Sequence, residues 1–224
     1  MDAAIRQVMF PVLSRAHDEK EKFIDIMRRM NKLGSFVIFP VMFGLSAVAK
    51  PLILLLLKEK WLPAAPLLAI LSIAEAQIPL TSANTVALKS LGRSDLYAKQ
   101  EVLRRVLMAA VLLVSILAFD SLTAIAVGYA LSAWLDVIVT SFPIKKLLNY
   151  GAADQFRDVW KNLVSASLMA LAVYGLGLLL PLPTGLLLCV QVLCGAAVYV
   201  LLNLLLKNDS LLYILSMVKQ HRAA

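Results

Sequence analysis

The chain has 224 residues, of which 61% are hydrophobic, with a mean hydropathy of +0.82 and a formal net charge of +8. This composition excludes a soluble domain. The sequence has no HExxH, Walker A or GxSxG pattern, and its two histidines, His17 and His221, lie outside the apolar segments, which argues against Ser/His hydrolysis and direct use of ATP. Cys189 and Cys194 lie on an apolar stretch. Free cysteines in such surroundings usually behave as small hydrophobic residues, so we expect neither a disulfide nor a metal site there. We therefore expect an integral membrane protein with no catalytic residues, no cofactor and no metal site.

Six apolar segments have the length of a membrane-spanning helix, which needs about 20 mostly apolar residues. The sequence thus predicts an all-α polytopic bundle of six transmembrane helices. The predicted spans are Leu33–Leu57, Ala64–Lys89, Lys99–Ala118, Leu122–Pro143, Val159–Leu180 and Thr184–Leu206.

The basic residues between these segments predict the orientation of the chain. Cytoplasmic loops carry an excess of Lys and Arg, and here one side holds 19 of them while the other holds only Lys50, Lys58 and Lys60. Both termini are therefore expected in the cytoplasm. The same bias accounts for the net charge better than nucleic-acid binding does, and it leaves membrane lipid headgroups and pyrophosphates as partners of the basic side.

The ends of the chain are predicted to lie on the cytoplasmic side. Over His17–Lys32 apolar residues recur at helical spacing among charges, which favours an amphipathic helix at the membrane interface. The apolar stretch Ile5–Leu13 is too short to span and is typical of the inner end of a longer helix, so we expect a truncated chain. Residues 207–224 are expected to form an amphipathic tail.

These features divide the chain into four parts. Residues 1–32 form the interfacial segment, 33–143 contribute four helices of a transporter bundle, 144–206 form two further helices with no charge at depth, expected to be peripheral, and 207–224 form the tail. Pro51 disfavours a helical Lys50, so the first span should end near Ala49, followed by a short separate turn.

Two carboxylates at membrane depth are the main candidates for transport, because such groups usually face a protein interior or an aqueous cavity. Glu75 lies near the middle of the second span, where the helical wheel places Ser72, Pro79 and Ser82 on its face. The wheel places Gln77, Thr81 and Asn84 on the opposite face, so the helix should lie inside the bundle, with a kink at Pro79.

Asp136 belongs to a polar stripe in the fourth span. Tyr129, Ser132, Asp136, Thr140 and Pro143 follow spacings of 3, 4, 4 and 3 residues, as expected for one wall of an aqueous cavity. For Ser132, Thr140 and Asn84, hydrogen bonds to neighbouring helices are the favoured interpretation. The candidate translocation and ion-coupling residues are Glu75, Asp136, Gln77, Asn84, Tyr129 and Ser132.

Four basic residues are candidates for binding an anionic headgroup. Arg104 and Arg105 lie one to two turns inside the third span, and Lys89 and Arg93 flank the preceding loop. Their side chains either extend back to the lipid headgroups, the commoner outcome, or point inward, where guanidinium geometry suits phosphate.

Several short strings, in order, resemble the C-terminal part of bacterial Wzx-like polysaccharide flippases of the MATE-related MOP exporter superfamily. The resemblance covers Phe10–Leu96, and the helix pattern to the C-terminus is compatible with it; Lys58 departs from it, since the family commonly has glycine there. The matching strings are Phe10-Pro11-Val12-Leu13-Ser14-Arg15, Phe39-Pro40-Val41-Met42-Phe43-Gly44-Leu45, Glu59-Lys60-Trp61-Leu62-Pro63 with Pro66-Leu67-Leu68, and Leu91-Gly92-Arg93-Ser94-Asp95-Leu96.

The resemblance implies a function and also a missing part. Such flippases have two six-helix bundles, with the substrate path between them, and move an undecaprenyl-pyrophosphate-linked oligosaccharide across the bacterial inner membrane, for lipopolysaccharide or exopolysaccharide synthesis, using an ion gradient. The sequence would therefore lack the N-terminal bundle and would be inactive alone. The missing bundle would belong to the same chain or to another one. Two alternatives are an independent six-helix channel or small-solute carrier acting as a homo-oligomer, and a gene fragment without function.

Overall fold

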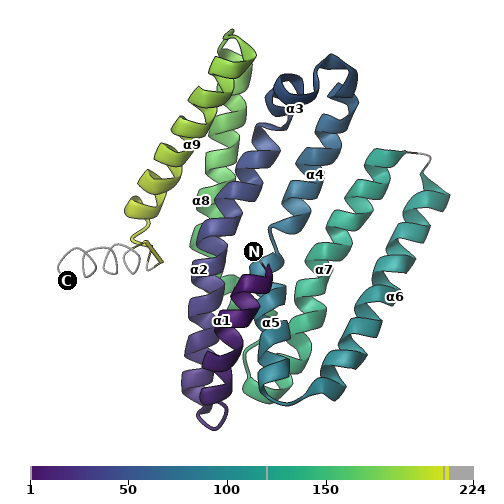
Figure 1. Ribbon diagram of the computed structural model, residues 1–224, viewed down its shortest axis with the longest axis vertical. Helices are drawn as coiled ribbons and strands as arrows, with labels where there is room; N and C mark the ends of the chain where they lie inside the picture. The colour runs from purple at the N-terminus through teal and green to yellow at the C-terminus, as the bar shows by residue number, and fades with distance from the viewer. Residues whose placement is uncertain (1, 120, 209, 212–224) are drawn as a thin grey trace.

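The computed structural model describes residues 2–119, 121–208, 210 and 211, with side chains from residue 9 onward. Within them the chain is a bundle of helices that pack in a row, with α6 at one edge and α9 at the other (Figure 1). The helices are α1 (Asp2–Arg15), α2 (Lys20–Ala47), α3 (Ala49–Leu57), the 3-10 helix η1 (Glu59–Ala64), α4 (Ala65–Glu75), α5 (Ile78–Ser90), α6 (Ser94–Ala118), α7 (Leu122–Leu148), α8 (Ala152–Leu179) and α9 (Thr184–Leu205).

The all-α membrane architecture is confirmed, and the number of spans is close to the prediction. Five segments of the described chain are long and apolar enough to cross a membrane: Lys20–Ala47, Glu59–Ser90, Leu122–Leu148, Ala152–Leu179 and Thr184–Leu205. The remaining predicted span, Lys99–Ala118, corresponds to α6, which has 25 residues but carries Glu101, Arg104 and Arg105 in the half nearest α5.

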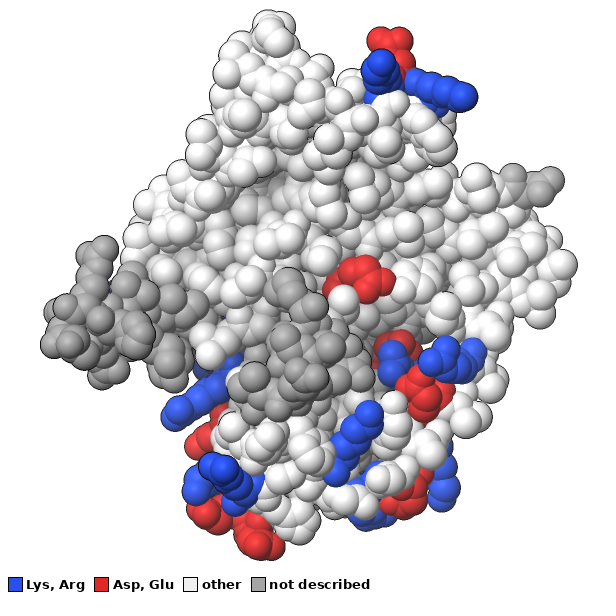
Figure 2. Space-filling model, in the orientation of Figure 1, with Lys and Arg blue, Asp and Glu red and all other residues white. Residues whose placement is uncertain are grey.

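The turns between helices lie at two ends of the bundle. The α1–α2, α5–α6 and α7–α8 turns lie at the lower end in Figure 1, and α3 lies at the opposite end. We call the lower end the basic end, because Lys and Arg side chains gather there on the face shown in Figure 2. The predicted amphipathic tail from residue 212 onward lies outside the described residues.

The first part of the chain differs from the expected interfacial helix. Residues 20–47 form one continuous helix, α2, and its apolar stripe faces protein. Phe23, Met27 and Met30 are buried in a cluster with Leu13 of α1 and Val86 of α5. The stripe that predicted contact with a membrane surface therefore packs against α1 and α5.

The break after α2 is confirmed. The helix ends at Ala47, and α3 begins at Ala49 with Pro51 in its first turn. Proline has no N–H to donate to the carbonyl four residues earlier, here that of Ala47, so the α2 hydrogen-bond ladder cannot continue through it.

Of the last two helices, only α9 is peripheral. The structure differs from the expectation for α8, which packs extensively against α2 and buries a face along most of its length. Small and polar residues on this face permit close packing and interhelical hydrogen bonds: Asn162 Nδ2 donates to Ser35 Oγ of α2 at 2.7 Å. Such residues carry no charge, so the hydropathy and charge pattern of α8 did not indicate a central position. Helix α9 packs mainly against α8, and its Tyr199 donates to the Phe36 carbonyl of α2 at 2.8 Å.

Candidate functional site: a polar cavity at a broken helix

The second predicted span is divided into two helices, and the division lies at Glu75. Helix α4 ends at Glu75 and α5 begins at Ile78, with Pro79 in its first turn. In a continuous helix the amide of residue 79 would donate to the Glu75 carbonyl, but proline has no amide hydrogen and its ring would clash with that carbonyl. The break therefore falls before the proline, where the sequence predicted a kink.

A contact from α7 holds the end of α4. Trp134 Nε1 donates a hydrogen bond to the Ile73 carbonyl at 3.1 Å, and this carbonyl belongs to the last turn of α4. Carbonyls at a helix end lack partners within the helix and need them from elsewhere. The Trp134 indole thus fixes the broken end beside α7.

A polar cavity of about 290 Å³ lies between the broken helix and the next two helices. Acidic side chains are visible at mid-height on the face shown in Figure 2, away from the charges at both ends. The cavity is lined by Glu75, Gln77, Ile78, Thr81, Ser82, Thr85, Arg104, Met108, Tyr129, Ser132, Ala133 and Asp136.

The two candidate carboxylates both line this cavity but have different partners. Tyr129 of α7 donates its hydroxyl hydrogen to Glu75 Oε1 at 2.7 Å. Asp136, two turns further along α7, accepts from Arg104 Nη2 of α6 at 2.8 Å. Asp136 is thus compensated by a positive charge, whereas the Glu75 contact is to a neutral hydroxyl.

Arg104 also contacts a second carboxylate. Its Nη1 donates to Glu101 Oε2 at 3.2 Å, and Arg105 Nη2 donates to Glu101 Oε1 at 2.8 Å. Arg104 keeps 24% of its side chain exposed and Arg105 keeps 76%. Of the two adjacent arginines, Arg104 therefore faces the cavity and Arg105 faces away.

Gln77 lies on the same side as Glu75, and the predicted placement on opposite faces is wrong. The helical wheel assumes one continuous helix, and the break at residues 76–77 ends that continuity, so Glu75, Gln77 and Thr81 line one cavity. Gln77 is only 7% exposed. Among the described residues, its Oε1 and the Nε of Arg104 are buried polar atoms with no hydrogen-bond partner, which is what a cavity that admits water or a ligand provides.

Asn84 and Thr140 do not line the cavity. They form hydrogen bonds between helices instead, which was the favoured interpretation from the sequence. Asn84 Nδ2 donates to Thr140 Oγ1 at 3.1 Å and to Gln155 Oε1 of α8 at 3.1 Å, and Gln155 Nε2 donates back to Asn84 Oδ1 at 2.7 Å. All three side chains are fully buried. They join α5, α7 and α8, while Ser132 lines the cavity and donates to the Tyr129 carbonyl.

The other basic candidates lie outside the cavity, at the basic end. Lys89 Nζ lies 4.3 Å from the centre of the Tyr97 ring. Arg93 pairs with Asp95 through two hydrogen bonds of 3.0 and 3.1 Å. Of the four predicted headgroup residues, only Arg104 is at the site.

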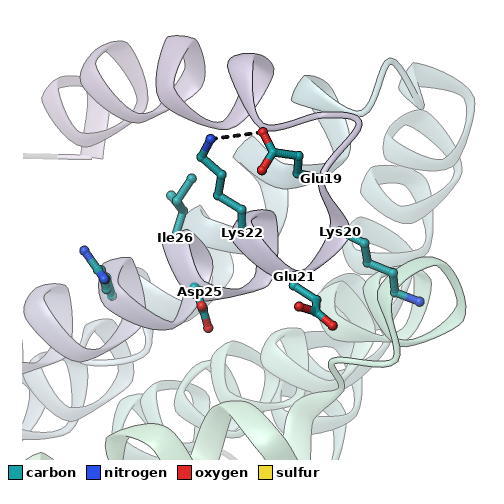
Figure 3. Close-up of a pocket in the computed structure, with 7 residues that line it drawn as sticks. Glu19, Lys20, Glu21, Lys22, Asp25 and Ile26 are labelled. Atoms are coloured by element: carbon teal, nitrogen blue, oxygen red, sulfur yellow. Dashed lines mark hydrogen bonds and ion pairs between the residues drawn. The ribbon is translucent and has the colours of Figure 1, made fainter.

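A second hollow lies at the basic end, beside the α1–α2 turn (Figure 3). It is lined by Lys20, Lys22 and Arg29, and by an equal number of acidic residues: Glu19, Glu21 and Asp25. Figure 3 shows Lys22 paired with Glu19, at 3.0 Å. Because its charges balance and it lies at the edge of the bundle, it is a weaker candidate for transport.

A polar network at the basic end was not found from the sequence. Tyr150, between α7 and α8, is buried, donates to Asp158 Oδ2 at 2.8 Å and accepts from Asn31 Nδ2 at 3.2 Å. Arg28 Nε lies 3.7 Å from the same Asp158 oxygen. The network joins Arg28 and Asn31 of α2 to Tyr150 and Asp158, and Asn31 and Tyr150 are 119 residues apart in the sequence, so no local pattern connects the two pairs.

Comparisons with known proteins support the resemblance to polysaccharide flippases. Residues 1–66 match a family model described as a polysaccharide biosynthesis protein. The chain is 25% identical over 176 residues to the teichuronic acid biosynthesis protein TuaB of Bacillus subtilis (strain 168), covering 78% of this chain and 36% of that protein. It is also 25% identical over 142 residues to an uncharacterized membrane protein in the cps region of Klebsiella pneumoniae, covering 63% and 29%.

A solved structure supports the fold. The lipid II flippase MurJ, in an inward closed conformation, matches with a TM-score of 0.72 and 15% sequence identity, over 92% of this chain and 43% of that one. The chain thus spans less than half the length of each of these proteins. Together the matches confirm the predicted resemblance and the multi-pass membrane architecture.

Proposed function

We propose that the chain is part of a flippase that moves a polyprenyl-pyrophosphate-linked oligosaccharide across the bacterial inner membrane for polysaccharide synthesis. Undecaprenyl pyrophosphate is the proposed carrier. The basic end would face the cytoplasm, where the positive-inside rule puts it. In this proposal a second helical bundle, on the same or another chain, completes the substrate path.

The observation that carries the proposal is the polar cavity at the broken helix. Side chains from α5, α6 and α7, together with Glu75 at the end of α4, converge there at mid-height of a bundle with an apolar exterior. Charged groups at such depth are costly and mark substrate or ion paths, and discontinuous helices form the sites of many transporters. The MurJ-like fold and the polysaccharide relatives agree with this interpretation.

The charges of the cavity suggest how transport is coupled to an ion gradient. Its lining includes two carboxylates, Glu75 and Asp136, and one guanidinium, Arg104. One negative charge is left over, and a proton or a monovalent cation would neutralise it. We assign that role to Glu75, since Asp136 is already paired with Arg104.

Complementation of a flippase-null strain tests the proposal. The chain is expressed alone and as a fusion to the N-terminal portion of a close relative, and surface polysaccharide is measured. We expect the fusion to restore polysaccharide. A fusion that is inserted and stable but restores none, with several relatives as donors, contradicts the proposal, and rescue by the chain alone would instead indicate a self-assembling transporter.

A further inference from the structure

The guanidinium of Arg104 is held by carboxylates of the protein itself. Nη2 donates to Asp136 at 2.8 Å and Nη1 donates to Glu101 at 3.2 Å, whereas the buried Nε has no partner among the described residues. Arginine presents Nε–H and one Nη–H along one edge, which fits two oxygens of one phosphate or carboxylate. Asp136 uses only the Nη2 half of that edge.

From this geometry we infer that Arg104 is a binding site for the pyrophosphate of the substrate and that Asp136 occupies it until the pyrophosphate displaces that carboxylate. The inference rests on the proposed function and assigns one step of it to two residues. A phosphate group can take both Nε and Nη2, so it forms one more hydrogen bond on this edge than Asp136 does. Charge-assisted bonds of this kind are among the strongest in proteins.

The surroundings of Arg104 require that Asp136 leave. The charged groups that face or contact it are Asp136 and Glu75 across the cavity and Glu101 on its own helix, with Arg105 drawn away to Glu101. An anion placed beside Asp136 would meet a like charge at close range, which is unfavourable where the groups are partly buried and less screened by water. Asp136 therefore makes the site selective for groups that carry more charge than a single carboxylate.

The test is the binding of farnesyl pyrophosphate to the full chain in detergent micelles, measured by native mass spectrometry. We expect Arg104→Gln to weaken binding by about tenfold or more, the loss of a charged bidentate contact. The matched control is Arg105→Gln, the adjacent exposed arginine, for which we expect less than about a twofold change because exposed charges contribute little. Asp136→Asn keeps the shape but removes the competing charge, so it should tighten binding by about fivefold to tenfold.

Two further measurements keep the test decisive. Arg104→Lys retains the positive charge but lacks the paired Nε–H and Nη–H donors, so it should bind the probe less tightly than the native chain. This variant should fold even if Arg104→Gln does not. Farnesyl monophosphate, with one phosphate, should gain more from Asp136→Asn than the pyrophosphate does.

The inference is overturned if Arg104→Gln and Arg105→Gln bind equally well, if Asp136→Asn weakens binding, or if neither the native chain nor Asp136→Asn binds the probe. These outcomes leave the flippase proposal standing, because that proposal depends on rescue of polysaccharide export. Conversely, binding that depends on Arg104 in a chain whose fusion fails to restore export would support the site and reject the flippase function.

Discussion

At the scale of single residues, the surroundings of each polar group in the bundle separate structural from functional roles. Asn84, Thr140 and Gln155 satisfy one another and are fully buried. Glu75 and Asp136 line a cavity that also includes Arg104, which is paired with Asp136. The first arrangement fixes helices to one another, and the second leaves a net charge for a ligand or an ion.

Tyr150 gives a prediction about pH at this scale. Its burial, and secondarily the negative charge of Asp158, raise the pKa of its hydroxyl well above the usual range. The folded state thus favours the neutral form, so this stabilisation is complete below the pKa of an unfolded tyrosine, about 10, and is lost as pH rises above it. The network at the basic end should therefore weaken in alkali.

The measurement is thermal unfolding of the native chain and of Tyr150→Phe in detergent at pH 7 and pH 10.5. At pH 7 the variant should be less stable by about 1 kcal/mol, because Asn31 and Asp158 lose a partner. At pH 10.5 the difference should shrink or reverse. Tyr174→Phe, on an exposed tyrosine, is the control; an unchanged difference between the two pH values would contradict a raised pKa of Tyr150 in the folded chain.

The sequence predicted the residues of the site better than their geometry. Glu75, Asp136, Tyr129 and Ser132 were found because polar side chains at membrane depth are rare enough to stand out. The predicted placement of Gln77 on the face opposite Glu75 was wrong, because a helical wheel assumes a helix without a break. Which of Arg104 and Arg105 faces the cavity, and the network around Tyr150, depend on packing between distant segments.

At the scale of helices, the break at Pro79 forms the site. The proline lies against α2, where a Cβ added at Gly34 would be 3.0 Å from Pro79 Cβ. The break leaves the Glu75 carbonyl without its helical donor and brings Glu75 and Gln77 to one cavity. The sequence predicted a kink here, and the structure shows a complete interruption.

Replacement of Pro79 by alanine should therefore reduce transport without destabilising the chain. An alanine restores an amide donor for the Glu75 carbonyl, and interior prolines cost a helix about 3 kcal/mol. In the complementing fusion, we expect Pro79→Ala to have unchanged or higher thermal stability but less surface polysaccharide. Pro66→Ala, at the same position of α4, is the control, and equal export by the two variants would show that the break is not needed.

The contact between α6 and α7 depends on a glycine. A Cβ added at Gly128 would overlap Ser115 Oγ and lie 3.2 Å from Ser115 Cβ, whereas one added at Gly175 on α8 meets nothing within 4 Å. Small residues allow helices in membranes to approach closely. Gly128 thus permits α6, which packs mainly on α7, to stay at the edge of the bundle.

Gly128→Leu should consequently destabilise the chain by about 1–3 kcal/mol, the usual cost of overpacking. Gly175→Leu makes the same chemical change on another helix and should cost much less. Unfolding of the two variants in detergent, compared with the native chain, measures the difference. Equal stabilities would mean that α6 can move away from α7 without loss.

Hydropathy located most of the helices, but it did not identify which of them form the centre. The α2–α3 break followed from Pro51, whose effect on a helix is local. The continuity of α2 and the central position of α8 did not follow, since an amphipathic stripe and a row of small polar residues are equally compatible with a lipid interface and with protein neighbours. Those two features are decided by the contacts of α2 with α5 and α8 and by the buried cluster that α2 shares with α1.

At the scale of the whole molecule, the row of helices places the polar cavity between an apolar exterior and a basic end. Exposed large hydrophobic residues occur on α6, α7, α8 and α9, as expected for surfaces in lipid. Basic residues gather at the end where the α1–α2, α5–α6 and α7–α8 turns lie (Figures 1 and 2). In the proposed function, an anionic headgroup approaches Arg104 from this end.

The most direct test of this account is polysaccharide export by the complementing fusion with Glu75→Gln, compared with Glu59→Gln. Both changes remove one carboxylate and keep its shape, but Glu75 lies at the cavity and Glu59 is exposed in η1 at the opposite end from the basic turns. We predict that Glu75→Gln reduces export by about tenfold or more at normal protein levels, as expected when an ion-coupling group loses its charge, while Glu59→Gln exports normally. Normal export by Glu75→Gln would contradict the claim that the cavity at the broken helix is the transport site.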